Sequence, residues 1–520
     1  MFDLAAITCL ADIPRAQAAV RGDAEAVRFE GQAISFATLD ADADAVAAAL
    51  VAGGVVAGDR VGVLAKNHAR WYALFFGTAR VRACLAPVNA RLAAAEIAYI
   101  LADSEPAVLF VGAELFDTAL AAVADLPRPP RLVALHGAHP RFAPFEAWLG
   151  TATSPGLLPP PQPDDDVIQL YTSGTTGRPK GVVLANRNYR RWLEMASSIE
   201  GFAYEPGDTA MVVMPLFHVA GANMGIAALA QGARVVLVRD FVAADVLAIM
   251  VDERVAHAFL APAMIQLLLA LPGLDAARFG ALRTIAYGAS PIAADVLARA
   301  QAAFGCGFVQ FYGMTETTGG GTFLPPSAHG RPALALSCGV AWPETEVAIL
   351  DPAGHVLPAG AIGEIAIRGD LVMKGYWRRA DATAQTVVDG WLRTGDAGYM
   401  DADGHCFVHD RIKDLIVSGG ENIYPAEVEN AIHGCPGVAD VAVIGVPDAQ
   451  WGEAVKALVV AADPPPATAD VIAWTRARIA AFKAPKSVDF VATLPRNASG
   501  KLLRRELRAP YWAGRERAVG

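Results

Sequence analysis

The sequence predicts an α/β fold with a large N-terminal domain, made of two parallel α/β subdomains and a small β-rich subdomain, and a smaller α+β lid domain at the C-terminus. Short β-rich runs alternate with alanine-rich helical stretches as far as about residue 288, which is typical of parallel sheets. Between residues 339 and 410 the pattern changes to short strands separated by Gly/Asp turns. The last hundred or so residues mix strands and helices and indicate a separate unit.

The first α/β subdomain is predicted from strand-like residues 60–64 and 107–111 and from a helical stretch at residues 92–101. Residues 154–166 are rich in proline and end in three aspartates, which predicts an exposed linker between two subregions. Beyond it, residues 167–288 are expected to form a second parallel sheet. Its clearest buried strands are residues 210–214, 233–238 and 256–260.

One segment resembles a membrane span, because residues 209–233 contain no Lys, Arg, Asp or Glu and are long enough to cross a bilayer. Pro215, His218 and Gly221 interrupt it. A strand, a turn and a buried helix account for the same pattern, so we expect no transmembrane segment.

The end of the chain carries the strands and helices expected for the β-rich subdomain and the lid. In the β-rich subdomain the strands are expected at residues 363–368 and 398–409. In the lid, strands are expected at 438–445, 457–460 and 488–492, and helices at 426–433 and 469–479.

The composition of the chain limits the functions that the protein could have. The chain has 520 residues, of which 54% are hydrophobic and 18% charged, which is typical of a multidomain globular enzyme. A net charge of −10 argues against a nucleic-acid-binding surface. The six cysteines are scattered, without metal-finger spacing, and the N-terminus does not resemble a secretory signal. We therefore expect reduced thiols and a cytoplasmic location.

The most specific motif is a hydroxyl- and glycine-rich stretch at residues 171–182, which looks like a loop that holds a nucleotide's phosphates. Small residues let backbone N–H groups approach an anion, hydroxyls add donors and Lys180 adds positive charge. Pro179 precedes Lys180, so this is not a Walker A loop. A surface turn is the alternative for such a composition. The candidate phosphate-binding residues are Thr172, Ser173, Gly174, Thr175, Thr176, Gly177 and Lys180.

Further short motifs combine aromatic, hydroxyl, carboxylate and basic side chains with glycines. They lie, in chain order, at residues 217–221, 312–317, 393–396, 410–414, 418–425 and 495–501. In this order and spacing they resemble the motifs of acyl-CoA synthetases of the adenylate-forming (AMP-binding) superfamily, and the resemblance covers nearly the full length. It implies an N-terminal adenylate-forming domain at residues 1–410 and a mobile C-terminal lid at residues 411–520, with a hinge near Lys413.

The resemblance implies a reaction in which a carboxylate attacks ATP, and it assigns the charged residues to that step. Lys501 corresponds to the adenylation lysine, Glu316 to the Mg²⁺ ligand and Thr315 to a contact of the α-phosphate. Catalysis of this kind rests on positioning and charge neutralisation. As alternatives, Lys501 could be a solvated lysine in an Arg-rich tail and Glu316 a carboxylate at a helix N-terminus.

The remaining nucleotide contacts follow from the same resemblance. Asp396 corresponds to the acceptor for the ribose hydroxyls, with Arg411 beside it. His218 corresponds to a residue that borders the carboxylate pocket. As alternatives, Asp396 could be an ordinary turn aspartate, and His218 could be a buried histidine whose ring is hydrogen-bonded within the core. The adenine wall is expected from Gly288, Ala289, Ser290 and Tyr312, although Tyr312 could also be a plain core aromatic.

For the second step the resemblance implies transfer of the acyl group to CoA after rotation of the lid about Lys413. Gly419 and Gly420 would let the pantetheine arm approach the adenylate, and Trp451 would pack along it. Ala484 stands where some relatives have an arginine for a CoA phosphate, which leaves the contacts to the nucleotide end of CoA open.

The substrate is expected to be an apolar carboxylic acid, because the segments expected to line its pocket carry no fixed charge besides the catalytic residues. A medium- or long-chain fatty acid is the first choice and an aryl or cyclic acid the second. A stand-alone enzyme that loads a carrier-protein thiol is the rival within enzymes, and a non-catalytic nucleotide-binding protein is a remote one. The resemblance also makes a homodimer an expectation.

Overall fold

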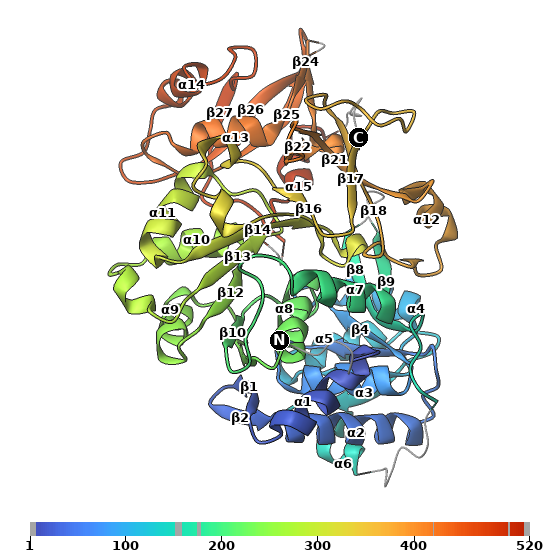
Figure 1. Cartoon of the computed structure of the whole chain (residues 1–520). Coiled ribbons are helices and arrows are strands. Elements are labelled where there is room, and N and C mark those ends of the chain that lie inside the picture. Colours follow the sequence, from blue (N-terminus) through green and yellow to red (C-terminus); the bar gives the residue numbers. More distant parts are fainter. Residues whose placement is uncertain (1–6, 151–158, 174–177, 420, 498–499, 514–520) are drawn as a thin grey trace.

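The computed structural model describes residues 7–150, 159–173, 178–419, 421–497 and 500–513. Within these residues the chain forms four sheets: two large sheets in the lower part of the molecule and two smaller β-rich units above them (Figure 1). This is the predicted architecture of two α/β subdomains, a β-rich subdomain and an α+β C-terminal domain.

The first large sheet has eight strands, and its central members are parallel. Its order is β19 (Gly375–Tyr376), β9 (Pro179–Ala185), β8 (Asp166–Ser173), β4 (Cys84–Val88), β3 (Arg60–Leu64), β5 (Val108–Val111), β6 (Arg131–Ala134) and β7 (Ala143–Pro144).

The second large sheet has nine strands and is parallel except at its two edges. Its order is β16 (Val340–Ala341), β15 (Gly321–Leu324), β14 (Gly307–Gly313), β13 (Thr284–Gly288), β12 (His257–Leu260), β10 (Thr209–Val212), β11 (Arg234–Leu237), β1 (Glu25–Phe29) and β2 (Gln32–Ser35).

The assignment of strands to sheets differs from the sequence prediction, which placed residues 167–288 in the second sheet and made no prediction for residues 25–35. The strands β8 and β9, expected to open the second sheet, belong to the first, where β8 lies parallel to β4 with Ile168 opposite Leu85. The N-terminal strands β1 and β2 join the second sheet beside β11 instead. The proline-rich segment is therefore not a boundary between the sheets. A strand's own pattern fixes which residues are buried, but its partner is decided by packing of distant segments.

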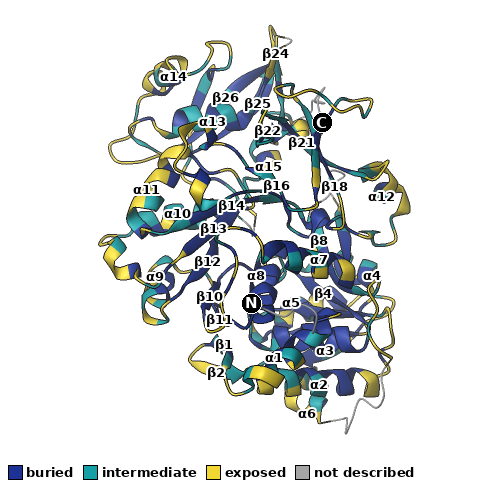
Figure 2. Ribbon diagram, in the orientation of Figure 1, coloured by how far each residue is buried: buried dark blue, intermediate teal, exposed yellow. Residues whose placement is uncertain are grey.

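Helices cover the large sheets and fill the space between them. They are α1 (Ile13–Arg21), α2 (Phe36–Ala52), α3 (Arg70–Arg80), α4 (Ala94–Ser104), α5 (Phe116–Val123), α6 (Phe145–Leu149), α7 (Asn186–Ala196), α8 (Val219–Ala230), α9 (Ala243–Asp252), α10 (Pro262–Leu269) and α11 (Ala294–Phe304). Helix α8 is buried on all sides, and one hydrophobic core joins it to both sheets (Figure 2). This explains its uncharged sequence. No helix in the described ranges has the length and apolar character of a membrane span.

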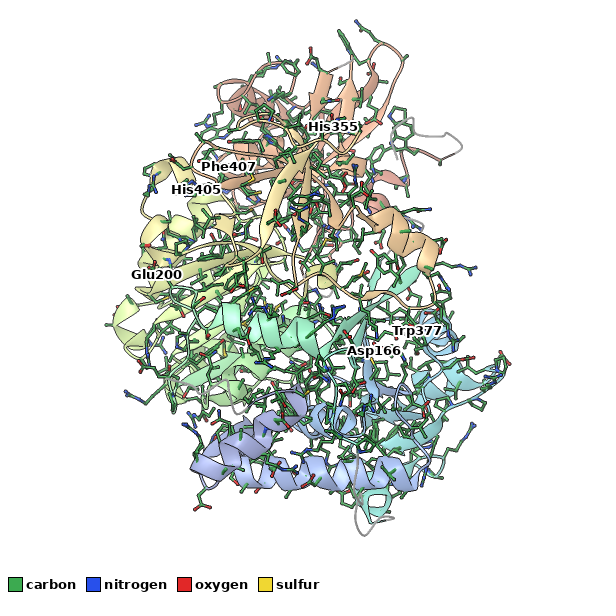
Figure 3. The ribbon with its side chains drawn as sticks, turned by 45° about the vertical axis from the view of Figure 1, so that its right-hand side comes forward. Asp166, Glu200, His355, Trp377, His405 and Phe407 are labelled. Atoms are coloured by element: carbon green, nitrogen blue, oxygen red, sulfur yellow. The ribbon has the colours of Figure 1, made fainter. Side chains whose placement is uncertain are left out.

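The β-rich subdomain has a five-stranded antiparallel sheet formed by β17 (Glu346–Leu350), β18 (Gly363–Arg368), β21 (Trp391–Met400), β20 (Val387–Val388) and β22 (Cys406–Arg411), with α12 (Ala380–Thr386) at its side. The strand expected at 398–409 is a hairpin of β21 and β22. In the turn between them the carboxylate of Asp401 accepts hydrogen bonds from the backbone N–H groups of Asp403 and His405, and it also contacts the His405 ring. Figure 3 shows the neighbouring side chains of His405 and Phe407 on this hairpin.

The C-terminal domain has its own five-stranded sheet and its own hydrophobic core. The sheet contains β24 (Glu421–Ile423), β23 (Ile416–Ser418), β26 (Gly452–Ala461), β25 (Val438–Asp448) and β27 (Ser487–Phe490), and the helices are α13 (Pro425–His433), α14 (Thr468–Arg476) and α15 (Arg504–Arg508). The predicted strands and helices of the lid are all present, with strands β25 and β26 longer than expected. All six cysteines are free thiols.

Candidate functional site

The β8–β9 hairpin and the turn after β14 meet at one carboxylate. Glu316 lies in a helical turn directly after β14 and is 5% exposed. Its Oε1 accepts hydrogen bonds from the hydroxyl of Thr172, at 3.3 Å, and from the hydroxyl of Tyr376, at 2.9 Å. Lys180, paired with Thr172 across the hairpin, holds its ammonium 4.8 Å from the centre of the Tyr376 ring. A cation, hydroxyls and a carboxylate thus gather at the base of the predicted phosphate loop.

The structure does not describe all of the predicted phosphate loop. Gly174, Thr175, Thr176 and Gly177 lie outside the described residues, as does Gly420 of the predicted CoA loop. Ser173 is the last residue of β8, opposite Pro179.

A second cluster surrounds Asp396 on β21. Arg411, directly opposite on β22, places Nε 2.8 Å from Asp396 Oδ1, and Tyr312 donates its hydroxyl to Oδ2 at 2.8 Å. Arg411 also donates to the carbonyl of Thr394 at 2.8 Å. Burial raises the pKa of Tyr312 well above its usual value, so its hydroxyl stays a donor at neutral pH. The carboxylate is held in one orientation, with lone pairs left on both oxygens for further donors.

The predicted adenine wall lies beside this cluster. Gly288 ends β13 opposite Phe311, and a Cβ at Gly288 would lie 2.4 Å from the Phe311 carbonyl oxygen, so only glycine fits. Ala289 then turns the chain with φ +66°, in the left-handed region. Ser290 follows and lines a cavity of about 80 Å³ between the N-terminal and C-terminal domains. The chain thus leaves β13 at Gly288, which pairs with Phe311 of β14, and Tyr312 is the next residue of β14.

Lys501 lines the same interdomain cavity as Ser290. Burial, followed by the positive charge of Arg411, lowers the pKa of the Lys501 ammonium to about 8, while Asp396 acts in the opposite direction. The lysine therefore lies within the electrostatic field of the Asp396–Arg411 pair, although it is 90 residues further along the chain than Arg411. Ser290 and Lys501 thus line one cavity, and the charges of Arg411 and Asp396 act on Lys501.

His218 caps the N-terminus of α8. Its Nδ1 accepts the backbone N–H of Ala220 at 3.2 Å, and burial lowers its pKa to about 4. The ring is therefore neutral near pH 7 and carries its proton on Nε2. Gly221 is required in the next turn, because a Cβ there would lie 2.2 Å from the Pro215 carbonyl oxygen.

Asn223, on the same helix, connects α8 to the turn that carries Glu316. Its Nδ2 donates to the carbonyl of Thr318 at 2.7 Å. The side chain is 2% exposed, and its Oδ1 has no hydrogen-bond partner within the described part of the chain. Thr315, at the start of this turn, is buried as well. His218 and the Glu316 turn thus flank the same helix.

Lys413 lies in a short helical turn between β22 and β23, where the β-rich subdomain passes into the C-terminal domain. Burial lowers its pKa. The next residue, Asp414, pairs with Arg508 of α15 at 2.9 Å. The predicted hinge therefore coincides with the covalent crossing between the two units, and Lys413 is not part of the Glu316 cluster.

The predicted CoA residues lie elsewhere. Gly419 has φ +61° and donates its N–H to the carbonyl of Trp451 at 2.8 Å, and a Cβ at Gly419 would lie 2.7 Å from the Trp451 ring. Trp451 is 43% exposed. Gly419 lies directly after β23 and Trp451 directly before β26. Figure 1 places β24, which follows Gly419, at the outer end of the molecule, far from α15. The two residues contact each other, but they do not join the cluster around Lys501.

Sequence reasoning missed Tyr376, and it included Asn223 only as one member of residues 218–224, which were expected to line the acid pocket. Tyr376 lies in a Gly-Tyr-Trp run between Lys374 and Arg378, and aromatic residues after a glycine in a basic stretch are a weak signal for a site. Asn223 is a polar residue inside an otherwise uncharged core helix, which is a stronger one.

Known proteins resemble this chain along most of its length. The family model described as AMP-binding enzyme matches residues 14–377, and the model described as AMP-binding enzyme C-terminal domain matches residues 427–501. A fatty acid–[acyl-carrier-protein] ligase of Streptomyces coeruleorubidus is 40% identical over 95% of both chains. A feruloyl-CoA synthase of an Amycolatopsis species is 40% identical over 96% of this chain and 98% of that protein.

The fold agrees with solved structures as well. The ATP-bound crystal structure of MatB from Rhodopseudomonas palustris superposes with a TM-score of 0.87 and 31% identity, covering 96% of this chain and 99% of that one.

Proposed function

Because this chain belongs to the AMP-binding enzyme family of adenylate-forming acid–thiol ligases, we propose that it activates an apolar carboxylic acid with ATP and transfers the acyl group to CoA. One carboxylate oxygen forms a bond to the α-phosphorus, and the bond from that phosphorus to the bridging oxygen breaks, releasing pyrophosphate. The CoA thiol then loses its proton, its sulfur attacks the acyl carbon, and AMP leaves with the oxygen it received.

The observation that carries this proposal is that charged residues from distant segments lie close enough for their charges to act on one another. Burial and the charge of Arg411 lower the pKa of Lys501, and the charges of Asp396 and Glu316 raise the pKa of Arg411 against the effect of burial. Asp396 can accept the two ribose hydroxyls on the lone pairs that Arg411 and Tyr312 leave open. Lys501 and Lys180 supply positive charge for phosphates and for the leaving pyrophosphate. These groups come from elements far apart in the chain, and a structural role alone does not require that they meet.

We include Mg²⁺ as the partner of ATP. Thr172 and Tyr376 occupy Oε1 of Glu316, whereas Oε2 accepts no hydrogen bond from the described residues. A carboxylate oxygen is a preferred ligand of this ion, so the donor set fits. When bound, the ion neutralises charge on the phosphates. Glu316 would hold it, and Thr315 would lie beside the α-phosphate.

The acid is proposed to be apolar, with a medium- or long-chain fatty acid first. The segments around His218, Tyr287 and Gly319 contain no charged residue except Glu316, so a second carboxylate on the substrate would have no partner. The fatty acid ligase among the relatives is in keeping with this choice.

A hydroxylated aryl acid is the second candidate, and one observation favours it. The carbonyl of Thr318 can only accept, so it fixes the amide of Asn223 with Nδ2 toward Thr318 and Oδ1 without a partner. A buried acceptor of this kind is stabilised by a donor such as a phenolic hydroxyl. The feruloyl-CoA synthase relative acts on an acid that carries one.

The acceptor thiol is proposed to be that of CoA, and a carrier protein's pantetheine is the alternative. The exposed Gly419–Trp451 corner suits either, because both present the same arm. The ligase from Streptomyces coeruleorubidus is named for an acyl-carrier protein. A non-catalytic nucleotide-binding protein is disfavoured by the joint presence of Lys501, Glu316 and Asp396.

The test is AMP release by the purified protein with ATP, Mg²⁺ and pooled fatty, branched and aromatic acids, with and without CoA. CoA-stimulated AMP release and a new acyl-CoA mass are the expected result. AMP release that CoA does not stimulate indicates the carrier-loading alternative. An absence of AMP with every acid contradicts the proposal.

A further inference from the structure

Tyr376 lies between the two charged side chains expected to contact the triphosphate and its metal ion. Its hydroxyl donates to Glu316 Oε1 at 2.9 Å, and the Lys180 ammonium lies 4.8 Å from the centre of its ring. One side chain thus contacts the carboxylate through its hydroxyl and the cation through its ring. Both contacts are of types that are stronger in partly buried surroundings.

The segment that carries Tyr376 is held rigidly between the two elements it connects. The backbone N–H of Met373 donates to the carbonyl of Glu316 at 2.8 Å, and the N–H groups of Lys374 and Trp377 donate to Val183 and Gly181 of β9 at 3.0 and 2.7 Å. The strand β19 therefore fixes Tyr376 relative to both Glu316 and β9, which carries Lys180. A side chain on so fixed a backbone can hold its partners within a narrow range of positions.

Trp377 anchors the same segment from the other side. The guanidinium of Arg60 lies 3.3 Å from the centre of the Trp377 ring and pairs with Asp166 at 2.8 Å, while the indole N–H donates to the carbonyl of Asp103 at 3.0 Å. Figure 3 shows Asp166 and Trp377 together at this edge of the first sheet. This anchoring leaves Tyr376 little freedom to follow a displaced Glu316.

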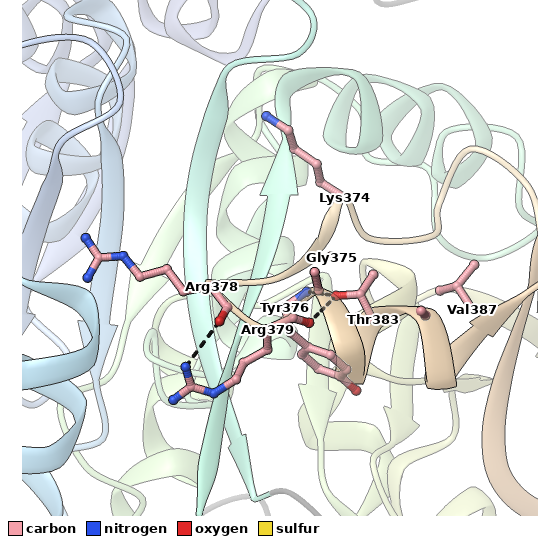
Figure 4. A pocket seen from close by; sticks show the side chains of 9 residues that line it. Lys374, Gly375, Tyr376, Arg378, Arg379, Thr383 and Val387 are labelled. Atoms are coloured by element: carbon pink, nitrogen blue, oxygen red, sulfur yellow. Dashed lines mark hydrogen bonds between the residues drawn. The ribbon is translucent and has the colours of Figure 1, made fainter.

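The ring of Tyr376 also forms part of the wall of a pocket. It lines an open pocket of about 730 Å³ together with Lys374, Arg378 and Arg379 (Figure 4). These cations already pair with Asp166, Glu105 and Asp103, so the pocket itself is not an obvious anion site. A smaller side chain at position 376 would bring the solvent of this pocket toward Glu316.

We propose that Tyr376 is a positioning residue of the nucleotide site. Its hydroxyl holds Oε1 of Glu316, so that Oε2 alone is presented to the divalent cation that accompanies ATP. Its ring holds the Lys180 ammonium beside the position of that cation. This inference rests on the proposed function. Thr172 gives the same oxygen a second donor, at the longer distance of 3.3 Å.

The test compares Tyr376→Phe, which keeps the ring and removes the hydroxyl, with Tyr376→Leu, which removes both contacts. Binding of the non-reacting analogue α,β-methylene-ATP is measured by calorimetry without acid, over a Mg²⁺ titration and in EDTA. Partners that orient a metal ligand typically change metal affinity 10–100-fold. For Tyr376→Phe we expect about tenfold more Mg²⁺ at half-maximal nucleotide affinity, and binding in EDTA unchanged within twofold. For Tyr376→Leu we expect binding in EDTA to weaken as well.

Tyr399→Phe is the matched control, since Tyr399 stacks on Phe407 in the β-rich subdomain, away from the site, and should behave as wild type. Circular dichroism and melting temperature establish that each variant is folded, and Thr172→Val provides an independent removal of the second donor to Oε1. A Mg²⁺ requirement within twofold of wild type in Tyr376→Phe would overturn the inference alone, whatever the effect of Thr172→Val. Failure of the wild-type protein to bind the analogue with Mg²⁺ would instead overturn the proposed function on which it rests.

Discussion

Arg411 and Asp396 face each other across β21 and β22, with Nε of the arginine 2.8 Å from Oδ1 of the aspartate. Both side chains are largely buried, and Tyr312 bonds the second oxygen of the same carboxylate. The pair thus supplies a fixed acceptor at the site proposed for the ribose, and Lys501 lies within reach of its charge.

Asp396→Asn should weaken ATP binding about 100-fold, because hydrogen bonds to a charged acceptor contribute about 1.5–3 kcal/mol each. It should also lower the free energy of unfolding by about 3 kcal/mol, since Arg411 loses its counter-charge in a buried position. Calorimetry with ATP and denaturant unfolding measure the two effects. The control is Glu346→Gln, which breaks an exposed pair with Arg368 and should change stability by less than about 1 kcal/mol. Equal effects of the two variants would contradict this account.

The alkaline limit of adenylation should report Lys501. Its charged form is needed, and its pKa is about 8, so kcat/KM for ATP should fall as pH rises through about 8. Because Asp396 raises this pKa, Asp396→Asn should move the limit to lower pH. Between pH 8 and the usual lysine value of 10.5 the unfolded chain binds this proton and the folded chain does not. This group therefore makes stability rise with pH in that window.

The pH–rate profile of acid-dependent ATP–pyrophosphate exchange measures the activity limit. Lys501→Arg serves as the comparison, because a guanidinium stays protonated and any residual activity should lack the limit. A limit near pH 8 that persists in Lys501→Arg would assign it to another group.

His218 should act as a neutral donor. With a pKa of about 4 it does not titrate between pH 5 and 8, and its Nδ1 is already occupied by the N–H of Ala220. His218→Gln can place an amide N–H near the position of Nε2 and should retain activity within about tenfold, whereas His218→Ala should lose about 100-fold, as when a donor to a reacting oxygen is removed. Hydroxamate formation from the acyl-adenylate measures this step. Equal losses in the two variants would argue against a donor role.

Gly419→Ala should impair the thiol step and leave adenylation intact. The backbone at Gly419 has φ +61°, and the new Cβ would lie 2.7 Å from the Trp451 ring, so that ring must move. Hydroxamate formation should stay within twofold of wild type, while acyl-CoA formation should slow at least tenfold. Gly404→Ala is matched to it, because Gly404 has φ +83° but no atom within 4 Å of the new Cβ. An equal slowing in Gly404→Ala would show that backbone strain alone is responsible.

Local sequence patterns were sufficient to predict most of the helices and strands. The strand at 363–368 has the bounds predicted for it, and the uncharged segment at 209–233 folds as a strand and a buried helix because its interruptions match the turn before α8. Motif order led to the prediction of one site for Asp396, Arg411 and Lys501, and the structure has the charges of Arg411 and Asp396 acting on Lys501. Strand partners could not be predicted in this way, so β8 was assigned to the wrong sheet and the place of β1 was not predicted.

Specific contacts between distant segments could not be predicted from the sequence either. Tyr376 meets Glu316 across 60 residues of chain, and nothing in the local pattern of either residue indicates the other. Asn223 pairs with Thr318 across 95 residues in the same way. Gly419, Trp451 and Lys501 all lie in the C-terminal domain. Their separation depends on how that domain itself folds, which is a property of packing and not of sequence spacing.

Attack of a carboxylate oxygen on the α-phosphorus of ATP can be followed with an accepted acid labelled with ¹⁸O in both carboxylate oxygens. The labelled acid is incubated with ATP, Mg²⁺ and CoA, and the products are analysed by mass spectrometry. We expect one ¹⁸O in AMP and one in the thioester for each turnover, with unlabelled pyrophosphate. Release of ADP with ¹⁸O in inorganic phosphate, or of AMP without label, would contradict it.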